Sequence, residues 1–257
     1  MSNRLKHLKI KALSIVSDWF SAFPFFIQGR MDIDPKSLWI DNKFNEEFGG
    51  FFTQGKEGHP QLSSLPLHDN VRRDMLLLMC KSIATRNVDG AIAELGVFQG
   101  KTARLFHHYF PDREIYLFDT FSGFDARDVK AEKTTTGVET TKAHFSNTNL
   151  ELVKSVIEPA NNNVHLIEGY FPQSWPSKLD QKIFALVHLD ADLYEPTKAG
   201  LEHFYRRLNI GGMIIIHDYN AWAGARLAVD EFCSEINLIP IPMPDKSGSC
   251  IILKTAK

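Results

Sequence analysis

The stretch from Ala91 to Thr102 constrains the fold of this chain more than any other part. It reads as a short buried strand, a turn bracketed by Gly96 and Gly100, and the start of a helix with free N–H groups in its first turn. Glycine permits a positive φ and the close approach of a ligand. Glu94 is the charged residue of the strand, and a buried acid is unfavourable unless another group uses it. The pattern predicts a strand–turn–helix unit that binds a ligand.

The spacing of the glycines narrows the class of ligand. The Gly-x-x-x-Gly pattern lacks the third glycine of the dinucleotide fingerprint, although an NAD-dependent sugar-modifying oxidoreductase or epimerase on a similar sheet remains an alternative. An acid two positions before Gly96 favours a cationic ligand instead. S-adenosylmethionine has this character, because it carries a sulfonium and an amino group but no phosphate. An ordinary strand-to-helix turn with Glu94 at the surface is the simplest competing interpretation.

Four further apolar runs follow, and each ends at an acidic residue. Helices are expected between them, including one from Pro196 to Leu208 that ends at Asn209 and Gly211-Gly212. Strands that alternate with helices predict a parallel sheet with right-handed crossovers, and continuous apolar runs favour strands covered on both faces. A helix from Ala225 to Ile236 and two closing strands complete an α/β, doubly wound, mostly parallel seven-stranded sheet. The expected strands are Ala91–Leu95, Glu114–Asp119, Val164–Gly169, Phe184–Asp190, Met213–Asp218, Leu238–Ile241 and Ser249–Leu253.

The flanking segments divide the chain into a domain over residues 71–257 and an extension over residues 1–70. Leu5 to Phe23 has the spacing of an amphipathic helix, which we expect to pack on the domain or on a second subunit rather than on a membrane. Asp69 is expected to cap a helix from Val71 to Arg86. Arg72 and Arg73 lie in its first turn, where we expect a solvated pair, with binding of an anion or carboxylate as the alternative.

The segment from Ala126 to Asn149 is polar and rich in threonine, and it is long for a connection in a compact domain. We expect a lid or binding loop there, or a partly disordered segment, followed by a helix from Leu150 to Ile157.

Composition excludes several classes of protein. The net charge of −2 over 257 residues gives no basic field for nucleic acid. Three scattered cysteines lack metal-site spacing and favour a reducing, cytoplasmic location. No apolar run approaches the roughly 20 residues of a membrane span, and polar residues interrupt any signal-peptide core.

Ligands of open α/β sheets bind beyond the carboxyl ends of the strands. This chain places an acid at the end of each of the first five expected strands: Glu94, Asp119, Glu168, Asp190 and Asp218. Asp119 follows Gly100 by 19 positions, where a carboxylate can accept hydrogen bonds from ribose hydroxyls. Ser122 and Gly123 follow and are expected to line the same pocket. The pattern therefore favours a nucleoside pocket at this edge.

The last two of these acids lie in Asp190-Ala-Asp192 and His217-Asp218. Clustered like charges in a cleft need a counter-ion, and a divalent cation with oxygen ligands is the simplest one. We expect Asp190 and Asp218 to bind it, with Asp192 or His217 as a further ligand. Imidazole shifts the preference from Mg²⁺ toward Mn²⁺. Alternatively, His217 packs or acts as a base without a metal.

Together, four motifs resemble the macrocin O-methyltransferase family, over roughly Leu76 to Leu253. Members are class I S-adenosylmethionine-dependent methyltransferases that methylate sugar hydroxyls, often with a bound divalent cation. The family usually has a second Asp where this chain has His217, and Gly where Ala191 stands, which leaves metal identity and metal dependence open. The motifs are Glu94-Leu-Gly-Val-Phe-Gln-Gly100, Phe118-Asp-Thr-Phe-Ser-Gly-Phe124, Leu189-Asp-Ala-Asp-Leu-Tyr-Glu195 and Gly212-Met-Ile-Ile-Ile-His-Asp-Tyr219.

The resemblance implies that the glycine turn holds the methionine end of the cofactor, that Asp119 takes the ribose and that Glu168-Gly169 lies near the adenine. The predicted cofactor-binding residues are Glu94, Gly96, Val97, Phe98, Gly100, Thr102, Asp119, Ser122, Gly123, Glu168, Gly169 and Asp190. The predicted metal ligands are Asp190, His217 and Asp218, and the predicted catalytic residues are Asp190, Asp192 and His217.

The expected reaction is direct methyl transfer from the sulfonium to a hydroxyl group. A cation would bind two adjacent hydroxyls and lower the pKa of the attacking one, and Asp192 or His217 would accept the proton. The expected acceptor is a sugar or a glycosylated small molecule, although another vicinal diol fits the same chemistry. We expect a homo-oligomer such as a dimer, with residues 1–70 in the acceptor pocket or the dimer contact. A non-catalytic nucleoside-binding or scaffolding domain is the alternative of another class.

Overall fold

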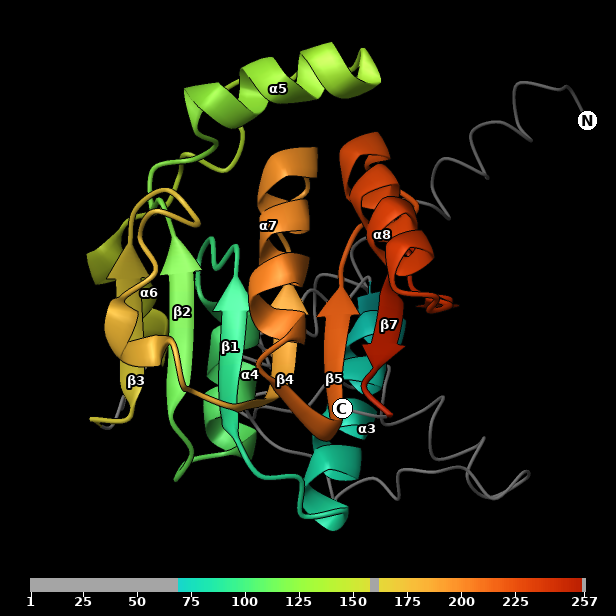
Figure 1. Cartoon of the computed structure of the whole chain (residues 1–257). Coiled ribbons are helices and arrows are strands. Elements are labelled where there is room, and N and C mark those ends of the chain that lie inside the picture. Colours follow the sequence, from blue (N-terminus) through green and yellow to red (C-terminus); the bar gives the residue numbers. More distant parts are fainter. Residues whose placement is uncertain (1–68, 158–161, 256–257) are drawn as a thin grey trace, which may run out of the picture. The chain divides into compact units, whose positions relative to one another are not determined.

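A seven-stranded sheet lies between two layers of helices (Figure 1). The structure, a computed structural model, describes residues 69–157 and 162–255. The strand order is β3-β2-β1-β4-β5-β7-β6, and β7 runs antiparallel to β5 and β6. The predicted mostly parallel seven-stranded sheet is thereby confirmed. The strands are β1 (Ala91–Leu95), β2 (Ile115–Asp119), β3 (Val164–Glu168), β4 (Phe184–Leu189), β5 (Leu208–Ile216), β6 (Ile241–Pro242) and β7 (Cys250–Leu253).

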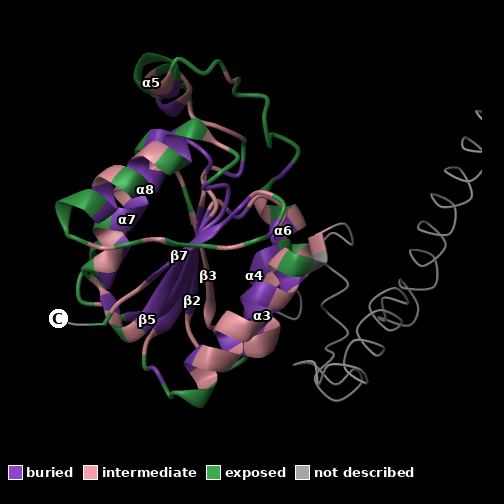
Figure 2. Ribbon diagram, turned by 90° about the vertical axis from the view of Figure 1, so that its right-hand side faces the viewer, coloured by how far each residue is buried: buried purple, intermediate pink, exposed green. Residues whose placement is uncertain are grey.

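Helices cover both faces of this sheet. Figure 2 shows α7 and α8 on one face and α3, α4 and α6 on the other, with buried strands between them. Every residue of β1 and β4 is buried, because both strands lie in the middle of the sheet. These strands therefore have continuous apolar runs rather than an alternating pattern. The helices are α3 (Asn70–Thr85), α4 (Lys101–Tyr109), α5 (Ala126–Thr136), α6 (Leu150–Ile157), α7 (Tyr194–Tyr205) and α8 (Ala223–Glu235), with a 3₁₀ turn, η3 (Ser177–Leu179).

The register of the parallel strands brings their carboxyl ends to one level. Leu95 pairs with Phe118 of β2 and with Leu189 of β4, and Leu189 pairs in turn with Ile216 of β5. The chain runs outward from β1 through β2 to β3 and then returns to place β4 on the other side of β1. Open α/β sheets bind ligands beyond the carboxyl ends of the strands at such a reversal.

Two elements differ from the sequence-based expectation. Asn209 and Gly211-Gly212 do not terminate a helix but belong to β5, because α7 ends at Tyr205 and β5 begins at Leu208. The register between β4 and β5 shifts at this point, and glycine within a strand commonly marks such an irregularity.

The second difference is α5, which occupies the first part of the segment that was expected to be a loop or lid. Asp125 caps this helix by accepting a hydrogen bond from the backbone of Arg127, at 2.8 Å. Figure 1 shows α5 lying across the ends of α7 and α8. Its buried side chains are the acids Asp128 and Glu132. A helix that buries acids lacks the apolar stripe by which helices are recognised in sequences.

Two further expectations for the described residues hold. Asp69 caps α3 through a 3.1 Å hydrogen bond from the backbone of Arg72, and α6 has the expected bounds. Of the two closing strands, β7 lies within the expected Ser249–Leu253, whereas β6 shares only Ile241 with the expected Leu238–Ile241, and Pro240 cannot donate a hydrogen bond to a strand ladder. The expected amphipathic helix from Leu5 to Phe23 lies outside the described residues, as does almost all of the extension. No helix within residues 69–157 and 162–255 has the length and apolar character that a bilayer span requires.

Candidate active site at the carboxyl ends of the strands

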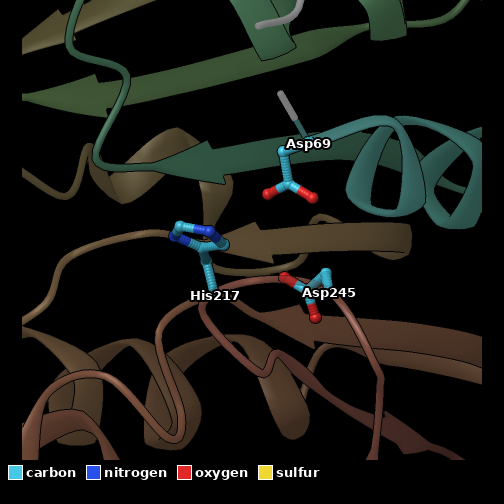
Figure 3. A group of neighbouring side chains, drawn as sticks. All are labelled: Asp69, His217 and Asp245. Carbon is cyan, nitrogen blue, oxygen red and sulfur yellow. The ribbon is translucent and has the colours of Figure 1, made fainter. Parts of the chain in front are cut away.

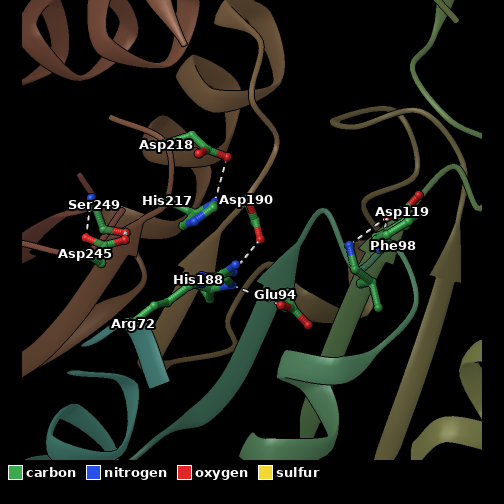
Figure 4. A network of polar contacts seen from close by, with 11 residues as sticks. Arg72, Glu94, Phe98, Asp119, His188, Asp190, His217, Asp218, Asp245 and Ser249 are labelled. Atoms are coloured by element: carbon green, nitrogen blue, oxygen red, sulfur yellow. Dashed lines mark hydrogen bonds and ion pairs between the residues drawn. The ribbon is translucent and has the colours of Figure 1, made fainter. Parts of the chain in front are cut away.

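Polar side chains from three neighbouring strands and one helix meet beyond the carboxyl ends of β1, β4 and β5 (Figure 4). Glu94 comes from β1 and His188 from β4, while Asp190 and His217 follow the last residues of β4 and β5. Arg72 reaches the same place from the first turn of α3. The cluster is therefore assembled by the strand register rather than by neighbours in sequence.

Glu94 and His188 form a buried pair below the cluster. They are register partners on adjacent strands, and Nδ1 of His188 lies 3.0 Å from Oε1 of Glu94. Burial raises the pKa of Glu94 well above its ordinary value and lowers the pKa of His188 to about 3. Burial therefore favours the uncharged form of both groups. Oε2 of Glu94 and Nε2 of His188 have no hydrogen-bond partner within the described part of the chain, so they can receive a ligand.

Asp190 is ion-paired to Arg72. Nη2 of Arg72 lies 2.7 Å from Oδ2 of Asp190, and the side chains are 15% and 21% exposed. The first turn of α3 thus carries a guanidinium bound to a carboxylate, not the solvated pair that was the preferred expectation. Burial alone would raise the pKa of Asp190, but His217 and Arg72 lower it, so the carboxylate is ionised.

His217 bridges two carboxylates. Its Nδ1 lies 2.7 Å from Oδ1 of Asp190 and 2.6 Å from Oδ2 of Asp218. Burial alone would lower the pKa of His217, but Asp190 and the two hydrogen bonds raise it to about 10. The imidazole therefore carries a positive charge at neutral pH, and with Arg72 it balances the charges of Asp190 and Asp218.

Asp192 lies beside the bridge and is 5% exposed. Burial, the charge of Asp190 and a hydrogen bond to Asp218 raise the pKa of Asp192 well above its ordinary value, which favours its protonated form. Its Oδ1 has no hydrogen-bond partner among the described residues. Asp192 and Asp218 have φ values of 60° and 57°. Non-glycine residues adopt this region at a cost of order 1–3 kcal/mol, and such strain is common at functional sites.

The chemistry of this cluster suits a divalent cation. Asp190, His217 and Asp218 each offer a ligand atom, and the three atoms lie within 4.8 Å of one another. Two carboxylates with one imidazole are ligands that Mn²⁺ accepts and Mg²⁺ tolerates. The structure thus brings the three predicted metal ligands together.

A second group of possible ligands, Asp69, His217 and Asp245, lies within the same 4.8 Å limit (Figure 3). Both acids of this group already have structural partners. Asp69 caps α3, and Asp245 accepts hydrogen bonds from the backbone and the hydroxyl of Ser249, at 2.7 and 2.8 Å. This group is therefore explained by the fold alone.

On the other side of β1, Asp119 holds the glycine turn. Its Oδ2 accepts hydrogen bonds from the backbones of Val97 at 2.7 Å and Phe98 at 2.9 Å, and its Oδ1 accepts one from Phe121 at 2.7 Å. A carboxylate offers about four acceptor positions, so most of them are engaged by the backbone. The contact with a ribose stays a prediction, whereas the hydrogen bonds of this residue in the structure position the turn.

Gly96 packs directly against the start of the segment after β4. It has a φ of +87°, and a Cβ on this residue would lie 2.1 Å from the backbone oxygen of Asp190. The backbone of Asp190 also donates a 2.8 Å hydrogen bond to the oxygen of Leu95. The turn after β1 and the acid cluster after β4 are therefore joined through backbone atoms.

The other predicted cofactor residues differ in how far they are buried. Val97 and Thr102 are buried, and Gly100 caps α4. Gly123 lies in the turn after β2, and the backbone of Gly169 donates to the oxygen of Asp119 at 2.9 Å. Glu168 and Ser122 are exposed, and their contacts with a cofactor stay predictions.

Sequence reasoning missed His188 and gave carboxylate binding by Arg72 only as an alternative. His188 is a polar residue inside an otherwise apolar buried strand, two positions before Asp190, and that position was a usable signal. Arg72 stands 118 positions from Asp190, and only the packing of α3 against the sheet brings the two together.

Known proteins resemble this chain over most of its length. The family model described as macrocin-O-methyltransferase (TylF) matches residues 58–253. A demethyldecarbamoylnovobiocin O-methyltransferase of Streptomyces niveus is 26% identical over 62% of this chain and 63% of its own length. An 8-demethyl-8-(2,3-dimethoxy-alpha-L-rhamnosyl)-tetracenomycin-C 4'-O-methyltransferase of Streptomyces olivaceus is 29% identical over 69% of this chain and 71% of its own length.

Among solved structures, the O-methyltransferase NovP superimposes with a TM-score of 0.60 at 21% identity. The match covers 72% of this chain and 80% of that one, and it shows a shared fold.

Proposed function

Because this chain belongs to the macrocin O-methyltransferase family, we propose that it transfers the methyl group of S-adenosylmethionine to a hydroxyl group of a sugar or glycosylated small molecule. The observation that carries the proposal is the meeting of Glu94, Asp190 and His217 at the strand ends beside the glycine turn. A methyl donor and an acceptor hydroxyl need a common crevice of this kind, because transfer requires both to be held in line.

Two features support the binding of S-adenosylmethionine: a carboxyl oxygen without a hydrogen-bond partner among the described residues and a glycine in the turn. The free Oε2 of Glu94 suits the ammonium group of the methionine end, and Gly96 leaves the turn without a side chain. Asp119 keeps this turn in place and has little acceptor capacity left for a ribose. When bound, S-adenosylmethionine supplies an electrophilic methyl group on its sulfonium. The predicted cofactor residues at the tips of β2 and β3, Ser122, Gly123, Glu168 and Gly169, complete the proposed pocket.

We propose that Asp190, Asp218 and His217 hold a divalent cation, Mg²⁺ or Mn²⁺. The donor set and the mutual distances of the three side chains support this. Such an ion supplies orientation of the acceptor diol and a lower pKa for its attacking hydroxyl. His217 ligates only as the neutral imidazole, so the proton on its Nδ1 must leave when the ion binds.

Asp192 is our proposed proton acceptor. Its unpartnered Oδ1 can accept a hydrogen bond from the acceptor hydroxyl, and its carboxyl group is hydrogen-bonded to Asp218. A cation beside Asp192 would favour the ionised form of this residue, and its carboxylate would then accept the hydroxyl proton at Oδ1 while Asp218 stays ionised as a ligand. His217, the other predicted acceptor, would be engaged as a ligand of the proposed cation.

The acceptor class is proposed from the relatives. One of them acts, by its name, at the 4' position of a rhamnosyl-bearing tetracenomycin derivative. The expected homo-oligomer and the cytoplasmic location also remain proposals, as does the boundary near residue 70.

The decisive test combines binding and turnover. Calorimetry with S-adenosylhomocysteine should show binding, and NADH should not bind. Incubation with S-adenosylmethionine and a panel of glycosides should give a product with one added methyl group by mass spectrometry. Asp190→Ala should abolish transfer while S-adenosylhomocysteine still binds. Failure to bind S-adenosylhomocysteine rejects the proposal, whereas binding without transfer across the panel favours the non-catalytic alternative.

A further inference from the structure

Arg72 forms an ion pair with Asp190, which is also one of the proposed ligands of the cation. Its guanidinium reaches Asp190 from α3, and burial of the pair leaves 15% and 21% of the two side chains exposed. The charge of Asp218 also acts on Arg72. A cation in this position interacts with the whole acidic cluster, not only with its hydrogen-bonded partner.

Both oxygens of Asp190 are occupied by nitrogen donors. Nη2 of Arg72 lies on Oδ2, and Nδ1 of His217 lies on Oδ1. His217 can lose its proton and become a ligand, but a guanidinium stays charged and never ligates a metal ion. A divalent ion on Asp190 therefore meets one fixed competitor, which is Arg72.

The geometry of the contact between Arg72 and Asp190 also allows a metal ion to replace the guanidinium. It is a single hydrogen bond through Nη2, and Nε of Arg72 is buried without a partner in the part of the chain that the structure describes. The two-bond fork by which guanidinium groups bind carboxylates most firmly is not formed. Arg72 can therefore leave Oδ2 without breaking a bidentate pair.

We propose that Arg72 is a built-in counter-cation that occupies Asp190 when no metal ion is bound and weakens divalent-cation binding. The inference rests on the proposed cation site. Arg72 and His217 balance Asp190 and Asp218 without an ion, so a bound divalent ion adds charge in excess. The repulsion between this ion and the guanidinium lowers the affinity of the site, and Arg72 keeps the acids together until an ion arrives.

Direct Mn²⁺ titration of the full chain tests this, by calorimetry or by the electron paramagnetic resonance signal of the free ion. Arg72→Gln should bind Mn²⁺ at least about tenfold more tightly than the wild type, and Arg72→Lys, which keeps the charge, should stay close to it. The matched control is Arg86→Gln, which removes the same charge from the exposed end of the same helix and should change nothing. Asp190→Asn should remove the binding in every background.

An unchanged or weaker affinity in Arg72→Gln overturns the proposal, provided that its melting curve and its S-adenosylhomocysteine affinity show a folded chain. The wild type offers a second measurement that does not depend on a variant. The ¹⁵N–¹H signal of the Arg72 Nε, assigned with Arg72→Lys, should shift during Mg²⁺ titration and saturate with the binding curve. A signal that stays in place while Mg²⁺ binds overturns the proposal.

Separate measurements test the methyl-donor site and the cation site. S-adenosylhomocysteine affinity reports on the methyl-donor site and does not require the ion. If no variant binds Mn²⁺ or Mg²⁺ while S-adenosylhomocysteine binds, the cation site and the role of Arg72 fail and the methyl-donor site remains.

Discussion

The carboxylate of Asp119 lies 2.7 Å from the backbone nitrogen of Val97, so the end of β2 is hydrogen-bonded to the turn that follows β1. Asp119→Asn replaces one acceptor oxygen by a donor and leaves at least one buried N–H without a partner. We expect a loss of about 1–3 kcal/mol in the free energy of unfolding.

Thermal melts without cofactor separate the two roles of Asp119. A residue that only contacts a ribose would leave the melting temperature of the free protein unchanged. A residue that holds the turn lowers it, and S-adenosylhomocysteine affinity falls with it. Asp112→Asn, in an exposed acid of the turn before β2, is a suitable control.

Gly96→Ala should be one of the most damaging single-methyl substitutions in this domain. The new Cβ would lie 2.1 Å from the oxygen of Asp190, and the backbone has a φ of +87°. We expect a loss of about 3 kcal/mol or more, or no folded protein. Gly137→Ala is the matched control, because its φ is +76° but its Cβ meets no atom within 4 Å. It should lose only about 1–2 kcal/mol, and equal losses in denaturant titrations would contradict the clash.

Asp128 should make the stability of the domain depend on pH. Burial raises the pKa of Asp128 from 3.8 to about 6, although Tyr170 donates a hydrogen bond to it at 2.9 Å. Between these values the folded chain keeps a proton that the unfolded chain has lost. The free energy of unfolding contributed by this group therefore falls as the pH rises from about 4 through about 6, and the full penalty applies above that window.

Asp128→Asn removes this penalty and keeps an acceptor for Tyr170. After allowance for partial solvation, we expect the variant to be more stable by about 1–2 kcal/mol at pH 7.5 and equal to the wild type at pH 4. Urea titrations at the two pH values measure the difference. Glu139→Gln, which changes an exposed acid, should show no such difference between the two pH values. If Asp128→Asn gained equal stability at both pH values, the raised pKa of Asp128 would be contradicted.

Glu94 should link cofactor affinity to pH. Burial raises its pKa well above the ordinary value, so binding of an ammonium group requires the carboxyl to release its proton. S-adenosylhomocysteine affinity should therefore increase with pH. Glu94→Gln should lower it by about 10–100-fold and flatten the dependence, because the charged hydrogen bond is replaced by a neutral one.

The control for Glu94→Gln is Glu114→Gln, which changes a partly exposed acid directly before β2, at the amino ends of the strands. Calorimetry at pH 6, 7 and 8 provides the comparison. An affinity of Glu94→Gln equal to that of the wild type would remove Glu94 from the methyl-donor site.

The strands and their terminal acids were predictable because both signals are local. A buried central strand reads as a short apolar run, and the acid that follows it lies at the carboxyl edge once the strands are parallel. Glu94, Asp190 and Asp218 were therefore identified without knowledge of their contacts. Only the register determines that Glu94 meets His188, since these residues stand 94 positions apart.

The features that were missed or given only as alternatives depend on long-range packing. Arg72 has the pattern of a surface residue in a first helical turn, and its partner follows a strand far along the chain. The buried acids of α5 gave no apolar periodicity. Glu132 illustrates the reason, because its carboxylate accepts a 2.8 Å hydrogen bond from the backbone of Tyr194 at the start of α7.

The close backbone contact between Gly96 and Asp190 couples the turn after β1 directly to the acid that follows β4. A ligand that displaces the turn after β1 must also displace the acid that follows β4, because no flexible side chain lies between them to absorb the movement. Binding of the methyl donor at the turn should therefore change the affinity of Asp190 for the cation. Binding of the cation should change the affinity for the methyl donor by the same factor.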